Sequence, residues 1–290
     1  MHRLLLTVAA LLASLVPGAV GAAENQTWDR DFAVGRQPTV RIETDDAQVT
    51  VRSWKESKVK VRVSHRGPTQ GFTLGIQRPR VQLQQEGNQV RVMARMESAV
   101  SVNFFSNAHL DVDVWLPRES DLIVNAEDGP VKIEDVAGKI DLRSQDGPLV
   151  ADRLRGDIRV RSQDGSVRLD DVDGSLQLVT QDGESSVRGR FDRMEVESGD
   201  GGVEIEARTG SRLSEEWSVR SQDGGIRLHI PNDLAATIDA RSSDGSLSFD
   251  LPLQVQGRVR ENLLVGELNG GGPVLRLRTR DGSIRVMPID

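Results

Sequence analysis

A series of Asp-Gly pairs recurs along this chain, and its spacing constrains the fold more than any other feature. The first five pairs follow one another every 18 residues, and three more come at intervals of 23, 21 and 37. An active site is normally built once, so a phrase repeated at a fixed period indicates stacked structural units with insertions in the later ones. The eight pairs, which we expect to be structural corners, are Asp128 and Gly129, Asp146 and Gly147, Asp164 and Gly165, Asp182 and Gly183, Asp200 and Gly201, Asp223 and Gly224, Asp244 and Gly245, and Asp281 and Gly282.

The residues between two corners alternate between apolar and polar, which indicates strands with one buried face. A second glycine, at Gly138, Gly156 or Gly174, divides each unit into two short strands. No helical period is present over 128–290, so the alternatives are a sandwich of hairpins and a β-solenoid. The solenoid is favoured because stacked coils place each apolar residue beside the one 18 positions on. The predicted fold class is therefore all-β: a single-stranded, β-helix-like solenoid with regular coils over 128–290 and less regular strands before them.

The corners have a side-chain chemistry of their own. Glycine is expected there because tight turns need a positive φ. Most corners are preceded by a serine or a threonine, and these residues should stack as a column of hydroxyls. Gln145, Gln163 and Gln181 should stack beside them as an amide ladder in which each side chain satisfies its neighbour.

One unit departs from the pattern, because Ser185 and Arg190 stand in slots that are apolar elsewhere. Either Phe191 fills the gap through a local shift, or this coil is packed more loosely. Insertions at 208–216, 230–236 and 254–272 are the loops that are most free to carry specificity.

The chain divides into 1–23 and 24–290. The first segment has the layout of a secretory signal peptide: Arg3, an apolar run of 13 residues and small residues around a cleavage site. The second has no linker rich in Pro, Ser or Gly and is expected to be one domain of β-strand repeats. The ends of a solenoid must be covered against edge-to-edge pairing, and Trp28–Gly35 and Pro288 are the candidates. No transmembrane segment is expected after residue 23, and the predicted location is periplasmic or extracellular.

Composition narrows the classes of partner and of site. The chain has no cysteine, so an exported domain must be held by burial and backbone pairing alone. Its formal charge is −7, or −8 without Arg3, and this acidity argues against a nucleic-acid partner. Calcium on the column of corner aspartates remains open, although the glycine-rich nonapeptide of calcium-binding solenoids is absent. No metal site and no cofactor are predicted.

The chain has no constellation typical of an enzyme. It has no G-x-S-x-G motif, no phosphate-binding loop and no cysteine nucleophile. The three histidines after residue 23 are far apart: His65, His109 and His229. No catalytic residue is predicted, although two carboxylate pairs, Asp170 with Asp171 and Glu195 with Glu197, leave acid–base cleavage of a polysaccharide as an alternative.

A column of arginines is the most suggestive feature. Each stands one residue before the Ser or Thr of a corner, so in a solenoid all would share one edge, interrupted at Val179 and Glu197. Arginine suits the recognition of phosphate and carboxylate. The predicted ligand-binding residues are Arg143, Arg161, Arg220, Arg241 and Arg278. The alternative is a solvated edge whose charge is balanced by nearby Asp and Glu.

Three stretches resemble a bacterial family of unknown function, the "putative adhesin" family built of β-strand repeats. They are TDDAQVTVRSW at 44–54, the serial SQDGSVRL phrase, and GELNGGGPVLRLRTRDGSIRV at 266–286. The resemblance covers nearly all of 24–290 and implies a β-strand-repeat fold. It supplies no catalytic residue.

These features together predict a non-enzymatic, exported β-solenoid that acts as an adhesin-like scaffold or binding surface at the cell envelope. The expected partner is an envelope component or an anionic polysaccharide, held by repeated weak contacts that sum to avidity. One alternative is a self-assembling structural envelope protein that associates through open solenoid edges. A polysaccharide-active enzyme is the third interpretation.

Overall fold

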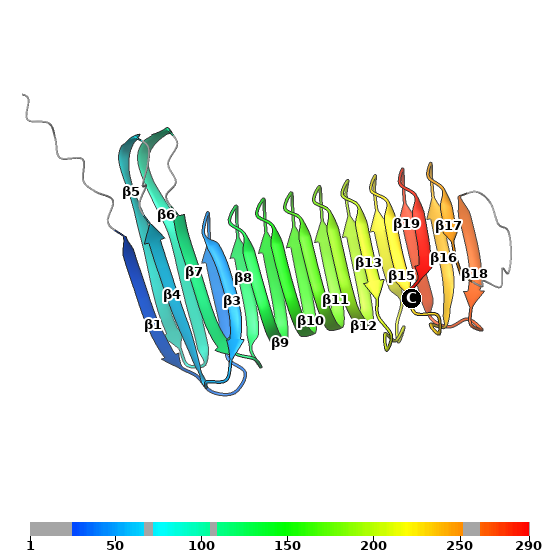
Figure 1. Ribbon diagram of the computed structural model, residues 1–290, viewed down its shortest axis with the longest axis horizontal. Coiled ribbons are helices and arrows are strands. Elements are labelled where there is room, and N and C mark those ends of the chain that lie inside the picture. The colour runs from blue at the N-terminus through cyan, green and yellow to red at the C-terminus, as the bar shows by residue number, and fades with distance from the viewer. Residues whose placement is uncertain (1–24, 67–71, 105–108, 252–261, 290) are drawn as a thin grey trace, which may run out of the picture.

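Stacked coils of β-strand form an elongated rod in the computed structural model of this chain (Figure 1). The structure describes residues 25–66, 72–104, 109–251 and 262–289, so the predicted signal peptide at 1–23 lies outside the described residues. Twenty strands and no helix are present in the described parts of the chain. The predicted all-β solenoid is therefore confirmed. None of the described segments is a helix able to cross a membrane.

Four bent strands of 14 residues make the regular part of the rod, and each contributes one half to each of two facing sheets. Neighbouring strands are parallel and offset by one repeat, so that Leu149 pairs with both Val131 and Val167. The bend falls at the second glycine of each unit, where Gly138, Gly156 and Gly174 have φ angles of 153°, 110° and 129°. The long strands are β9 (Val131–Ser144), β10 (Leu149–Ser162), β11 (Val167–Thr180) and β12 (Ser185–Ser198).

The two sheets extend beyond these four strands in both directions. In spatial order, the first sheet contains β1 (Gln26–Ala33), β4 (Lys58–Arg66), β7 (His109–Pro117), β3 (Gln48–Trp54), the first halves of β9 to β12, β13 (Val203–Ala207), β15 (Ile226–Ile230), β20 (Ile284–Pro288) and β17 (Leu247–Phe249). The second contains β5 (Phe72–Glu86), β6 (Gln89–Phe104), β2 (Thr39–Thr44), β8 (Asp121–Ala126), the second halves of β9 to β12, β14 (Trp217–Ser221), β19 (Val274–Thr279), β16 (Ala236–Ser242) and β18 (Leu263–Leu268).

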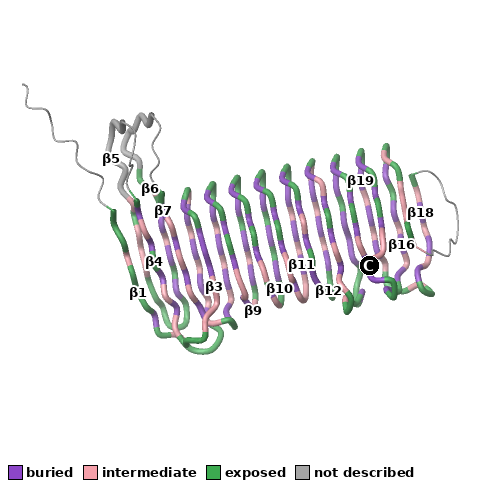
Figure 2. Tube along the Cα trace, viewed as in Figure 1, coloured by how far each residue is buried: buried purple, intermediate pink, exposed green. Residues whose placement is uncertain are grey.

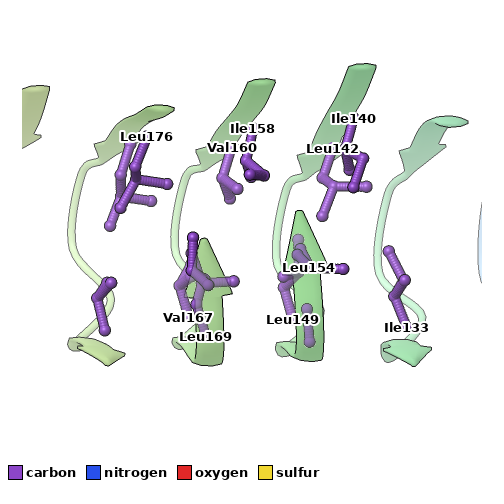
Figure 3. Packing of buried hydrophobic residues seen from close by; sticks show 14 of the residues in the cluster. Ile133, Ile140, Leu142, Leu149, Leu154, Ile158, Val160, Val167, Leu169 and Leu176 are labelled. Carbon is purple, nitrogen blue, oxygen red and sulfur yellow. The ribbon is translucent and has the colours of Figure 1, made fainter. Parts of the chain in front are cut away.

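The core is a set of apolar ladders between the two sheets. Buried and exposed residues alternate along every coil (Figure 2). Figure 3 shows side chains of one sheet facing those of the other, with Ile133, Leu149 and Val167 opposite Ile140, Ile158 and Leu176. All six are buried. Full burial of such a side chain stabilises the fold by about 1.5–3 kcal/mol, which accounts for a domain without disulfides.

The irregular unit is resolved by a local shift. Phe191 is fully buried, and its ring lies edge-on to that of Trp217, with the two centroids 6.2 Å apart. The ladder between β11 and β12 slips here, so that Val172 pairs with Gly189. Phe191 therefore fills the gap, and the coil is as closely packed as its neighbours.

The coils do not stack in the order of the chain. The last coil in the sequence, β19 and β20, lies between the coil of β14 and β15 and the coil of β16 and β17, as the red strands of Figure 1 show. The same arrangement occurs at the other end, where the coil of β2 and β3 lies between β6 and β7 on one side and β8 and β9 on the other. The uneven spacing of the later Asp-Gly pairs therefore reflects an inserted coil as well as longer loops.

Both ends of the rod are covered by antiparallel strands. β1 is the outer strand of the first sheet, which confirms the capping role expected of Trp28–Gly35. The role expected of Pro288 is wrong, because β20 is an inner strand and β17 and β18 form that end. The expected insertion at 254–272 lies partly outside the described residues, and its later part forms β18 rather than a loop.

Candidate functional site

The five predicted arginines lie in one line on the outer surface of the second sheet, but in two groups. Arg143 pairs with Arg161 in the ladder, and together they are the first arginine group. Arg278 pairs with both Arg220 and Arg241, and these three are the second arginine group. Val179 and Glu197 separate the groups, as the sequence predicts.

The second arginine group is neutralised by its surroundings. Glu197 lies 3.1 Å from Arg220, and Asp239 lies 3.3 Å from Arg241 and also hydrogen-bonds Arg278. The carboxylate of Asp239 is only 19% exposed. This half of the line therefore matches the alternative of a balanced, solvated edge.

Asp239 gives the rod an acid-sensitive contact. Burial raises the pKa of its carboxyl, but hydrogen bonds and charges from Arg278 and Arg241 outweigh burial and hold the pKa below its ordinary value. A carboxyl with a lowered folded pKa stabilises the fold above its unfolded pKa, and that contribution is lost as the pH falls through the folded value.

We expect Asp239→Asn to lower the free energy of unfolding by about 1 kcal/mol at pH 7, since the arginine partners are partly solvated. The loss should shrink at pH 3, where the wild-type carboxyl is itself becoming protonated. Thermal unfolding at the two pH values measures this. The control is Asp157→Asn, because Asp157 forms no ion pair with any described residue, and an equal loss in both variants would contradict the prediction.

The first arginine group borders a groove of about 550 Å³. Asp141 lies 3.2 Å from Arg143 and 3.9 Å from Arg161, so two guanidinium groups share one carboxylate. Arg95, from the hairpin strand β6, adds a third guanidinium to the groove lining. The two groups therefore differ: one borders a groove and is incompletely paired, and the other is compensated.

The polar side chains along this groove are not satisfied by one another. The predicted amide ladder is wrong: Gln145, Gln163 and Gln181 line the groove and are exposed, and their side-chain amides form no hydrogen bond with any described residue. Here the ladder bonds run between backbone groups, as from the Asp164 amide to the Gln145 carbonyl at 2.9 Å. The Oγ1 of Thr44, a residue only 3% exposed, has no partner among the described residues either.

The corner glycines are required for a reason that differs from the predicted one. None of the described corner glycines has a positive φ. A Cβ on Gly165 would instead lie 2.2 Å from the carbonyl oxygen of Gly147, one coil away, and the same clash recurs along the column. Glycine is therefore required by the close stacking of corners.

The hydroxyls before the corners are buried and form the predicted column. Ser144 Oγ donates to the carbonyl of Gly147 at 2.7 Å, and Ser162 Oγ donates to that of Gly165 at 2.8 Å. Each hydroxyl thus satisfies a corner carbonyl that faces the interior.

The acidic residues considered for catalysis or metal binding are engaged or dispersed. Asp170 is held by Arg208 at 3.0 Å, and Asp171 lies 3.2 Å from Arg155. Glu195 accepts a hydrogen bond from Gln177 at 3.3 Å. In the described part of the chain, no three acidic or histidine side chains are grouped so that they could hold a metal ion.

The comparisons with known proteins agree with this architecture. The sequence model of the Toastrack DUF4097 domain matches residues 37–287. This chain belongs to the Toastrack DUF4097 family. The family expected from the three sequence stretches is therefore confirmed.

Solved structures similar to this Toastrack chain cover nearly its whole length at low identity. A "putative cell adhesion protein" from Clostridium sporogenes is 9% identical, with a TM-score of 0.29, over 92% of this chain and 100% of its own. A "putative adhesin" from Bacteroides fragilis is 10% identical, with a TM-score of 0.38, over 91% and 97%. A "putative lipid binding protein" from Parabacteroides distasonis is 11% identical, with a TM-score of 0.38, over 90% and 96%. No curated protein matches the chain.

Sequence reasoning missed part of the groove in this Toastrack domain. Asn125 and Glu43 occupy the same line as the arginines, but they belong to β8 and β2, whose units lie outside the regular period. Arg95 gave no signal at all, because β6 reaches the groove only through the insertion of the β2–β3 coil next to it. The repeat therefore identified only the regular part of the lining.

Proposed function

We propose that this chain is an exported, non-enzymatic binding surface for anionic polymer of the cell envelope, and that the groove at the first arginine group is its binding site. The observation that carries the proposal is the incomplete pairing of Arg143 and Arg161, which share Asp141 beside a groove of about 550 Å³. Guanidinium groups that retain unused donors are suited to carboxylate and phosphate.

Binding rather than cleavage is supported by the acidic side chains. General acid–base cleavage needs two carboxyls free to act on one bond. In this chain the candidate pairs are held by arginine or amide partners, as at Asp170 and Glu197. The proposed export rests on the character of residues 1–23.

The test is co-sedimentation of the purified protein with isolated envelope fractions across a salt series. Wild type should be retained at low salt and released as salt rises, because the contacts are between exposed charges. Arg143→Ala with Arg161→Ala should lower the apparent affinity by about tenfold or more. Each charge-assisted hydrogen bond contributes about 1.5–3 kcal/mol, and about 1.4 kcal/mol corresponds to a factor of ten.

The matched control is Arg220→Ala with Arg241→Ala, which removes the same number of charges from equivalent positions. These two side chains are already engaged by Glu197 and Asp239, so retention should be nearly unchanged. Equal losses in the two double variants would show that only the overall charge matters. Absence of retention at every salt concentration would overturn the proposal, and filaments that grow with protein concentration would then favour self-assembly.

A further inference from the structure

We infer that the groove takes a linear, hydroxyl-rich polysaccharide with carboxylates on only some of its sugars, lying along the rod. This inference rests on the proposed function and names the polymer. The groove crosses the strands rather than following them, because its lining comes from five successive positions of one ladder line. These positions are Glu43, Asn125, Arg143, Arg161 and Val179.

The spacing of this line suits a repeating polymer. Neighbouring strands are about 4.8 Å apart, so four steps make a track of about 19 Å. One step is comparable to the length of one sugar in an extended polysaccharide. A chain laid along the track would therefore meet an equivalent set of groups at each coil.

The groups repeated at each step are amides. Gln145, Gln163 and Gln181 present one side chain per coil, and none of the three is hydrogen-bonded to another described residue. An amide both donates and accepts, which is what a hydroxyl also does, so a column of free amides matches a column of sugar hydroxyls. Thr44 adds a buried hydroxyl without a partner at one end of the same groove.

The charge of the groove favours a sparsely charged polymer over a dense polyanion. Its lining contains three arginines, but it also contains Glu43 and Glu127, and Asp141 already contacts Arg143 and Arg161. A polymer with a negative charge on every unit would meet these carboxylates as well as the arginines. One carboxylate at the arginine pair, with neutral hydroxyls beside it, fits the lining better.

The experiment measures the affinity of the purified protein for three probes: hyaluronan, which has a carboxylate on alternate sugars, inorganic polyphosphate and neutral dextran. Hyaluronan should bind about tenfold or more tightly than polyphosphate, and dextran should not bind. Replacing Gln145, Gln163 and Gln181 together by Ala should weaken hyaluronan binding by about tenfold and leave polyphosphate binding unchanged, since several modest hydrogen bonds are lost. The three side chains are exposed, so the midpoint of thermal unfolding should not change.

The control is Gln222→Ala, because Gln222 is the corresponding exposed corner residue of the β14–β15 coil, outside the groove lining. Its hyaluronan affinity should equal that of wild type. Polyphosphate binding as tight as hyaluronan binding, or an unchanged triple variant, would overturn the polysaccharide inference. If envelope retention still required Arg143 and Arg161, the proposed function would stand without it. Loss of retention itself would overturn both.

Discussion

Deletion of residues 273–290 should unfold far more of the rod than the deleted residues. The deletion removes β19 and β20, and these strands are the link between the coil of β14 and β15 and the coil of β16 and β17. Without them, β16 retains only β18 as a ladder partner. We expect hydrogen exchange to show loss of protection throughout 236–268, well upstream of the new chain end.

The size of this effect follows from burial. Leu275, Leu277, Ile284 and Val286 are fully buried in the inserted coil, and each contributes about 1.5–3 kcal/mol. Leu277→Ala makes the same test without a deletion, and it should cost about 2–5 kcal/mol. The control is Leu264→Ala in β18, at the spatial end of the rod, where the side chain is 9% exposed and the loss should be smaller. Unchanged protection of 236–249 in the deletion variant would contradict the inserted position of the last coil.

The repeat predicts contacts one coil away, and its power ends where the coils leave the order of the chain. Within 131–198, the offset of 18 residues identified the pairs correctly, such as Leu149 with Val167. It could not show that Arg278 lies between Arg220 and Arg241, because an inserted coil repeats the same apolar slots in any stacking order. Local patterning specifies which face a residue occupies, whereas the order of coils depends on contacts between distant segments.

The same distinction applies to the candidate site. The line of arginines was predictable, because side chains at equivalent repeat positions share one edge. Its division into two groups was not, since it depends on which carboxylates lie within reach. Asp141 and Asp239 stand at the same repeat position, two residues before an arginine, yet Asp239 engages Arg241 and Arg278 closely and Asp141 lies as far as 3.9 Å from Arg161. Side-chain distances of this kind are set by packing and not by periodicity.

Gly224→Ala and Gly225→Ala should differ sharply, although the two residues are adjacent in one turn. A Cβ on Gly224 would lie 2.1 Å from the carbonyl oxygen of Gly201 and 2.6 Å from its carbon, both backbone atoms of the neighbouring coil. These atoms cannot move away without breaking the ladder, so we expect a loss of about 3 kcal/mol or more in the free energy of unfolding. A Cβ on Gly225 would be 3.4 Å from the nearest atom, and the change should be close to neutral. Urea unfolding of the two variants measures the difference.

The chain contains a natural exception that explains why the clash has one direction. Ala47 occupies the first place in the corner column, and its carbonyl oxygen would lie 1.9 Å from a Cβ on Gly129. On its other side, β6 does not turn through a corner at this level: it pairs Ala94 with Thr44 and continues to Phe104. A side chain is therefore tolerated only where no corner of an earlier coil stacks against it. If Gly224→Ala were as stable as Gly225→Ala, close stacking could not be the reason for the repeated glycine, and the turn itself would have to supply it.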